Sequence, residues 1–247
     1  MPQQKSNFRE RFEALKSLPD SSFPTHLFII PDGNRRYAKA NGKPTFWGHQ
    51  KGFDVMVQIL RNLKDLPITV VGFWGFSADN WKRDEKEISA LMRIFARLID
   101  NYIDEIHQDN RRFIHIGRRD RLPQNLVKKI EAAEEKTRNN SGQIVCLALD
   151  FGGEDQNVRM IEKARTKDKD LEMNEENLWQ LRDSQGIVRS ADLIFRTSET
   201  RTSDVGWING KHSVLYFLPD KLFPQISEQE IVNSIVFYSK TKRNEGK

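Results

Sequence analysis

The sequence predicts an α/β domain built around a mostly parallel central sheet of about six strands flanked by helices. Short apolar runs alternate with longer segments of helical pattern, and several runs are apolar throughout, as in parallel strands covered on both faces. The intervening segments are long enough for helical crossovers. The six expected strands are His26–Pro31, Ile68–Trp74, Arg112–Ile116, Ile144–Phe151, Asp192–Arg196 and Val214–Phe217.

The clearest helix is expected from Glu85 to His107, because its apolar residues recur at the three- and four-residue spacing of one buried face. Core packing explains that face, and a lining for a long apolar ligand is the alternative. The dense charges of residues 163–177 indicate a solvated helix end, a loop and a helix cap at Asn174.

The domain organisation is expected to be simple, because no linker-like composition or internal repeat divides the 247 residues. We expect one catalytic domain over residues 23–247, preceded by an N-terminal helical segment over residues 1–22. That segment has Phe8, Phe12, Leu15 and Leu18 on one side. This apolar side either packs on the domain or makes a weak contact with a membrane surface.

The composition is that of a soluble protein, with 37% hydrophobic and 30% charged residues. No stretch reaches the roughly 20 apolar residues of a spanning helix, and residues 1–18 lack the apolar core of a secretory signal. Cys146 lies in an apolar run, so we expect its side chain to be buried. Because it is the single cysteine and cannot form an intramolecular disulfide, we expect a reducing, cytoplasmic compartment.

The formal charge of +5 invites a nucleic-acid interpretation. However, 35 acidic residues are interleaved with the basic ones, whereas nucleic-acid modules concentrate positive charge on one face. Small phosphorylated substrates are therefore the favoured partners of the arginines and lysines, and no nucleic-acid partner is expected.

The first chemical motif follows the first expected strand, where Asp32, Gly33, Asn34, Arg35 and Arg36 lead into a helical segment. Ligands of open α/β sheets bind beyond the carboxyl ends of the strands, and a helix N-terminus there favours an anion. The arginines suit phosphate oxygens. Alone, this segment is better explained as an ordinary turn, because Asp-Gly and Asn are common turn residues.

Two further segments at strand ends change that balance. Residues 75–83 include Ser77 and Asn80, which can hydrogen-bond a phosphate or assist proton transfer, although a helix cap would explain Asp79 and a half-buried position Trp81. Residues 196–203 combine two arginines with several hydroxyl groups. Three such sites would be surplus for a structural protein.

Together these segments resemble the cis-prenyltransferases, the undecaprenyl diphosphate synthase family, from about His26 to Phe223. The matching elements are DGNRR, GHxxG, FSxxNWKR, DFGG, RTS and LYF. Their ordered set is far more specific than any single element. The Asp-rich DDxxD motif of the trans-prenyl synthases is absent from the sequence.

The resemblance implies a Mg2+-dependent enzyme that condenses an allylic prenyl diphosphate with isopentenyl diphosphate in an elongated apolar cavity and forms cis double bonds. Asp32 would hold Mg2+ against the allylic diphosphate. The expected catalytic residues are Asp32, His49, Ser77 and Asn80. The expected diphosphate-binding residues are Gly33, Asn34, Arg35, Arg36, Trp81, Arg83, Arg196, Arg201 and Ser203. The family also implies a homodimer, with peripheral membrane contact if the product is long.

The sequence departs from the family at four places. Thr45 and Glu154 stand where arginines are usual, Val214 replaces a glutamate that helps to bind metal from the partner chain, and the RTSETR segment is one residue short. Three functions stay open: regular condensation, irregular head-to-middle condensation of the lavandulyl type, and a non-catalytic subunit of a heteromeric prenyltransferase. Retention of Asp32, Asn34, His49, Ser77 and Asn80 argues against the third.

Overall fold

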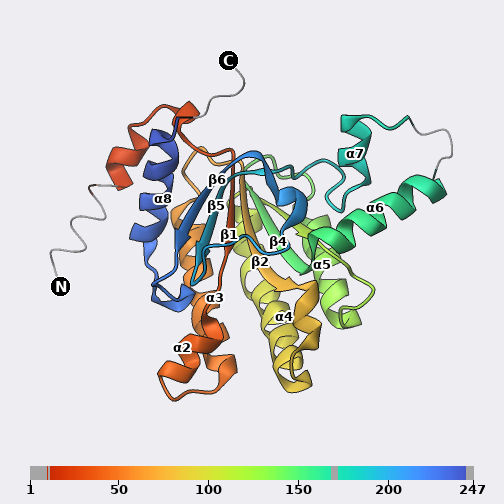
Figure 1. Ribbon diagram of the computed structural model, residues 1–247, viewed down its shortest axis with the longest axis horizontal. Coiled ribbons are helices and arrows are strands. Elements are labelled where there is room, and N and C mark those ends of the chain that lie inside the picture. Colours follow the sequence, from red (N-terminus) through yellow and green to blue (C-terminus); the bar gives the residue numbers. More distant parts are fainter. Residues whose placement is uncertain (1–9, 11, 168–171, 243–247) are drawn as a thin grey trace. The chain divides into compact units, whose positions relative to one another are not determined.

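The computed structural model describes residue 10 and residues 12–167 and 172–242. Its strands form a six-stranded sheet in the order β3-β4-β2-β1-β5-β6 (Figure 1). The pairs β1–β5 and β3–β4 are parallel. The strands are β1 (His26–Ile30), β2 (Val70–Ser77), β3 (Arg112–Ile116), β4 (Ile144–Phe151), β5 (Ala191–Thr197) and β6 (Asn209–Leu218). The predicted α/β class and parallel sheet are confirmed.

The strand bounds show where an apolar pattern is informative. All five residues of β1 are buried, and the prediction for it was one residue too long. By contrast, β6 has ten residues where four were predicted, because it begins with polar and largely exposed positions that carry no apolar signal.

Contacts group the chain into two compact units, each described here by itself. The first comprises the residues up to Val71 together with 191–201 and those from Gly210 on. In it α2 (Asn34–Ala40) packs on α3 (Thr45–Asn62), and α8 (Glu228–Lys240) packs on α3 and β5 (Figure 1). Two short 3-10 turns, η1 (Asp20–Ser22) and η4 (Phe223–Gln225), also belong to this unit.

The second unit comprises residues 72–190 and 202–209. Its helices are α4 (Glu85–Gln108), α5 (Gln124–Thr137), α6 (Gly153–Lys167) and α7 (Glu175–Leu181), with the short turns η2 (Ala78–Lys82) and η3 (Gly206–Ile208). Helix α4 packs on α5 and β3, and its predicted apolar face is buried in part: Leu91, Met92, Phe95, Ile99 and Ile106 are buried, whereas Ile88, Leu98, Tyr102 and Ile103 are half-buried. The side chain of Asn174 accepts a hydrogen bond from the Asn177 N–H, which confirms the predicted cap of α7.

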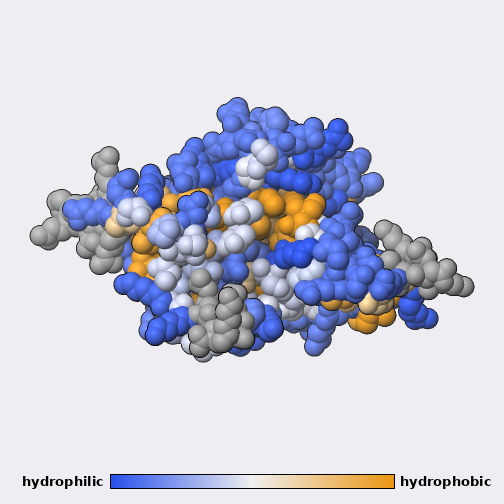
Figure 2. Space-filling model, turned by 90° about the horizontal axis from the view of Figure 1, so that it is seen from above, coloured by the Kyte–Doolittle hydropathy of each residue, from blue (hydrophilic) through white to orange (hydrophobic). Residues whose placement is uncertain are grey.

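The buried cysteine and the largely polar surface agree with what the sequence predicted. Cys146 is fully buried, and burial raises the pKa of its thiol. Most of the surface visible in Figure 2 is hydrophilic. Residues 12–16 are helical and Leu15 is buried, whereas Phe8 of the expected N-terminal helix lies outside the described residues. Within the described part of the chain, no helix has the length and hydropathy needed to span a membrane.

Candidate functional site

Asp32 is held by its backbone at the end of β1, in the first unit. Its carbonyl oxygen accepts hydrogen bonds from Thr197 Oγ1 at 2.7 Å, Ser198 Oγ at 3.1 Å and the Phe223 N–H at 2.9 Å. These donors come from the end of β5 and from η4. Because the backbone carries this anchoring, the carboxylate, whose side chain is 31% exposed, stays accessible at the strand end.

Gly33 is required where the chain leaves β1 and enters α2. It has φ of 104°, a left-handed conformation that favours glycine. A Cβ atom there would also collide with the Ser198 hydroxyl and Leu222. The turn therefore joins a left-handed residue to the first residue of α2, Asn34, whose amide nitrogen donates to the Pro31 carbonyl at 3.0 Å.

The GHxxG element brings α3 close to α2. A Cβ atom on Gly48 would collide with the Asn34 carbonyl oxygen, and one on Gly52 would collide with the Asn34 side-chain oxygen. His49, between them, is buried. These two glycines thus have a packing role, because they let α3 approach Asn34 at the start of α2.

Arginines and carboxylates form a cluster around Asp32. Asp32 Oδ1 lies 3.4 Å from Arg36 Nη2, and Asp32 Oδ2 lies 3.1 Å from Arg196 Nη2. Arg196, which pairs in register with Ile30 of β1, also donates to the Arg201 carbonyl at 2.7 Å. The structure therefore brings together four predicted site residues from two separate motifs.

Glu199 completes this cluster and was not predicted. Its Oε2 accepts from Arg196 Nη2 at 2.5 Å and from Arg201 Nε at 2.7 Å. Three arginines and two carboxylates give the cluster a formal charge of +1, which suits an anion. The sequence signal for Glu199 is its position between Arg196 and Arg201, which were both predicted to bind a diphosphate.

Ser77 and Asn80 lie in the second unit, at the end of β2 and in η2. The Ser77 N–H donates to Asn80 Oδ1 at 3.2 Å, so the Asn80 carbonyl oxygen closes the turn. Arg83 forms an ion pair with Glu87 at 3.0 Å, one turn further along the chain. The indole N–H of Trp81 donates to Asp150, a residue to which the sequence analysis gave no role of its own.

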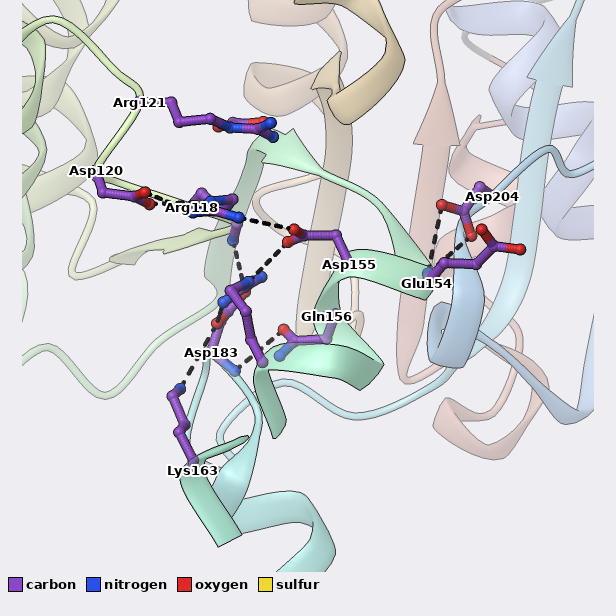
Figure 3. A network of polar contacts seen from close by, with 12 residues as sticks. Arg118, Asp120, Arg121, Glu154, Asp155, Gln156, Lys163, Asp183 and Asp204 are labelled. Carbon is purple, nitrogen blue, oxygen red and sulfur yellow. Dashed lines mark hydrogen bonds and ion pairs between the residues drawn. The ribbon is translucent and has the colours of Figure 1, made fainter. Parts of the chain in front are cut away.

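Ser203 also belongs to the second unit and has φ of 56°. Its neighbour Asp204 accepts from the Glu154 N–H at 3.2 Å, at the start of α6 (Figure 3). Burial, with the negative charge of Glu154 as a lesser cause, raises the pKa of Asp204. Arg201 and Ser203, predicted to bind one diphosphate, are thus assigned to different units.

An ion-pair network joins Arg118, Asp155 and Asp183 in the second unit (Figure 3). Arg118 pairs with Asp120 at 2.6 Å and with Asp155 at 3.0 Å, and Arg159 links Asp155 to Asp183. Because each arginine in it is matched by carboxylates, this network binds segments of the chain together.

Two of the family departures in the first unit, Thr45 and Val214, have simple structural places. Thr45 is the first residue of α3 and is half-buried. Val214 is 9% exposed in β6, whereas the next residue, Leu215, is 37% exposed. Neither side chain can bind a metal or pair with an anion as a carboxylate or guanidinium would.

Asp32 is the residue that fits a Mg2+ ion. Among the residues that the structure describes, no three His, Cys, Asp or Glu side chains gather as a metal cluster. Mg2+ needs no such cluster, because it keeps several waters and commonly uses one or two carboxylates together with substrate phosphates. Asp32 offers an accessible carboxylate, and the arginines around it suit the substrate phosphates that would supply further ligands.

A parallel α/β sheet with a net positive cluster at its strand ends is typical of proteins that bind phosphorylated ligands. The family model described as undecaprenyl diphosphate synthase matches residues 30–246. The chain belongs to this family, the cis-prenyltransferases, and is an enzyme of the prenyltransferase class, which confirms the resemblance seen in the sequence.

Individual relatives agree with this assignment. The isoprenyl transferase of Streptococcus pneumoniae strain R6 is 31% identical, with 97% of this chain and 98% of that protein covered. The ditrans,polycis-undecaprenyl-diphosphate synthase of Vibrio parahaemolyticus is 30% identical, with 91% of each covered. The crystal structure of lavandulyl diphosphate synthase from Lavandula x intermedia, in complex with dimethylallyl diphosphate, has a TM-score of 0.85 at 29% identity and covers 92% of this chain and all of that one.

Proposed function

We propose that this protein condenses an allylic prenyl diphosphate with isopentenyl diphosphate, forms a cis double bond and releases diphosphate in a Mg2+-dependent reaction. The observation that carries the proposal is the accessible carboxylate of Asp32 between Arg36 and Arg196. The family membership supports the same chemistry.

The cluster suits the departure of an allylic diphosphate. Negative charge builds on the diphosphate as its bond to carbon breaks, and guanidinium groups fixed beside it stabilise that charge. When bound, Mg2+ would neutralise part of the same charge. Asp32 would hold the ion, and the hydrogen bonds to its backbone carbonyl keep its position fixed before the substrate arrives.

The second substrate would be bound by Arg196, Arg201 and Ser203. Arg196 is 4% exposed and fixed by several contacts, whereas the Arg201 side chain is 68% exposed and can turn toward a ligand. Ser77 and Asn80 would assist the loss of the proton that ends the condensation. As part of this proposal, His49, Gly33, Asn34, Arg35 and Arg83 would surround the diphosphates as predicted, whereas Trp81 would not bind one directly, because its indole N–H donates to Asp150.

The test is incubation with Mg2+, labelled isopentenyl diphosphate and dimethylallyl, geranyl or farnesyl diphosphate, followed by product mass and double-bond geometry. A cis-prenyl product that disappears with EDTA and returns with Mg2+ is expected. Lack of product with every allylic substrate, from protein that is folded, would overturn the proposal.

Irregular condensation is the second candidate, favoured by the lavandulyl diphosphate synthase likeness and by the apolar Val214. In that reaction two allylic diphosphates would join head to middle. The discriminating observation is a branched product from dimethylallyl diphosphate alone, in the absence of isopentenyl diphosphate.

We also propose a homodimer, as the family implies. Ile231 and Ile235 of α8 are buried within the chain and do not contribute to such an interface. Leu215 is 37% and Phe237 45% exposed, and these two can contribute to an isologous interface. Light scattering at micromolar concentration should give twice the chain mass of 28.9 kDa, and a monomer would contradict the proposal.

A further inference from the structure

Asp150 is a buried carboxylate at the end of β4 whose two oxygens are both occupied. It is 0% exposed and has φ of 51°. The Trp81 indole N–H donates to Oδ1 at 2.8 Å, and Arg121 donates through Nε to Oδ2 at 2.8 Å and through Nη2 to Oδ1. A buried carboxylate must be paired, and here a two-pronged guanidinium and an indole satisfy it.

These contacts fix the orientation of the Trp81 ring. The Arg121 guanidinium lies over that ring, 5.8 Å from its centroid, and Phe76 meets it edge-on at 5.2 Å. The hydrogen bond to Asp150, the guanidinium over the ring and the edge-on Phe76 together restrict the orientation of the ring. The indole N–H is therefore engaged with the protein itself, which differs from the predicted role of Trp81 at a diphosphate.

Trp81 directly follows Asn80 in η2, so the two ends of this turn are held differently. The Ser77 N–H donates to Asn80 Oδ1 at one end, and Trp81 is tied to Asp150 at the other. Because the carbonyl oxygen of the Asn80 amide closes the turn, its amide nitrogen is the group left to meet a substrate. The direction of that nitrogen depends on both ties.

We propose that Asp150 and Arg121 are positioning residues that act through Trp81 to orient Asn80 for the proposed condensation. This role rests on the proposed function of Asn80. Asp150 has both oxygens engaged within the protein, and it acts on the reaction only through the turn. Asp150 and Arg121 would thus support the site, although no sequence motif assigns either of them to a substrate.

The test compares two tryptophan-to-phenylalanine variants. Trp81→Phe keeps an aromatic ring but loses the N–H bond to Asp150. Trp74→Phe is the matched control, because the Trp74 indole donates to the carbonyl of Phe151, the residue after Asp150, but Trp74 lies in β2 before the turn. Arg121→Gln is a second variant, which removes the guanidinium without altering Trp81.

Steady-state kinetics should separate positioning from binding. We expect Trp81→Phe and Arg121→Gln to lower kcat about tenfold with KM for both diphosphates within about twofold, and Trp74→Phe to change neither. An unchanged kcat in both test variants would overturn the proposal. A raised KM for one diphosphate with unchanged kcat would also overturn it, because Trp81 would then bind substrate directly.

Hydrogen exchange gives a readout that needs no turnover. The amides of residues 77–82 should lose protection about tenfold in Trp81→Phe relative to Trp74→Phe. If the wild-type protein transfers no prenyl group but this loss is seen, the proposed function fails while the tie to the turn stands. Equal hydrogen-exchange protection of these amides in the two variants would contradict the positioning proposal, whatever the activity.

Discussion

Two aspartates at strand ends, one in each unit, meet arginines in opposite ways. Asp32 follows β1 and is held by three hydrogen bonds to its backbone carbonyl, while its carboxylate lies 3.1 and 3.4 Å from two guanidinium groups. Asp150 ends β4 and is held by its carboxylate, which is fully buried. The Asp32 carboxylate accepts a hydrogen bond from Arg196, but it is 31% exposed and available for chemistry because its backbone carries much of the structural contact.

The largest expected effect follows from replacing the available carboxylate. Asp32→Ala should lower kcat by at least a thousandfold, roughly 4 kcal/mol of transition-state stabilisation, because Asp32 would hold the Mg2+ ion that neutralises charge on the leaving diphosphate. Urea unfolding should be nearly unchanged, since the backbone contacts of residue 32 remain. Turnover within tenfold of the wild type would contradict the role of Asp32.

Acid should weaken the second unit through His115 of β3. Its Nε2 contacts the Leu149 carbonyl at 3.1 Å, directly before Asp150. Burial, and less strongly the charge of Arg119, lowers the pKa of His115 from 6.5 to about 4. The folded protein thus keeps His115 neutral where the unfolded chain binds a proton, so its stabilising contribution is present above pH 6.5 and is lost as the pH falls toward about 4.

The expected loss is about 3 kcal/mol between neutral pH and about pH 4, at roughly 1.4 kcal/mol per unit of pKa difference. Urea unfolding of the wild type and of His115→Gln at both pH values measures it. The glutamine cannot take up the proton but can donate to the Leu149 carbonyl, so its acid loss should be smaller. Parallel losses in the two proteins would show that His115 is not responsible.

Removing the occupied carboxylate should lower stability, in addition to the loss of turnover expected when the tie to Trp81 is broken. Asp150→Ala should lower the free energy of unfolding by about 2–3 kcal/mol, because it leaves Arg121 and the Trp81 N–H without their shared acceptor. Arg121 is 37% exposed, so water replaces part of the lost interaction. Urea unfolding beside Asp32→Ala checks the contrast, and equal stability of the two variants would remove the distinction between the aspartates.

The sequence predicted the available aspartate better than the occupied one. Asp32 after one strand and Arg196 at the end of another were each predicted in a separate anion-binding segment, and the parallel β1–β5 pairing brings these two strand ends side by side. The tie between Trp81 and Asp150 spans 69 residues and depends on which way two side chains point. No local motif or periodicity encodes that direction.

The contacts of Glu199 were missed for the same reason, because they depend on the direction of a side chain. Its neighbours Arg196 and Arg201 were predicted from their type and place, but a single sequence does not show that the carboxylate between them turns back to contact both. The strand β6 was underestimated for a related reason, because the polar residues of its first half give no apolar signal. Chemistry-bearing residues were found from the sequence, and their mutual contacts required the fold.

The smallest expected effect concerns Glu199, whose carboxylate we expect to compete with a bound anion for Arg196 and Arg201. Glu199 occupies donors of Arg196 and Arg201 that a diphosphate would use. Glu199→Gln should therefore tighten the binding of inorganic diphosphate two- to fivefold, roughly 0.5–1 kcal/mol, as measured by titration calorimetry without turnover. Glu135→Gln is the control, because Glu135 also pairs with an arginine, Arg138, on the exposed end of α5. If Glu199→Gln weakens binding instead, Glu199 orients the arginines for the ligand and does not compete with it.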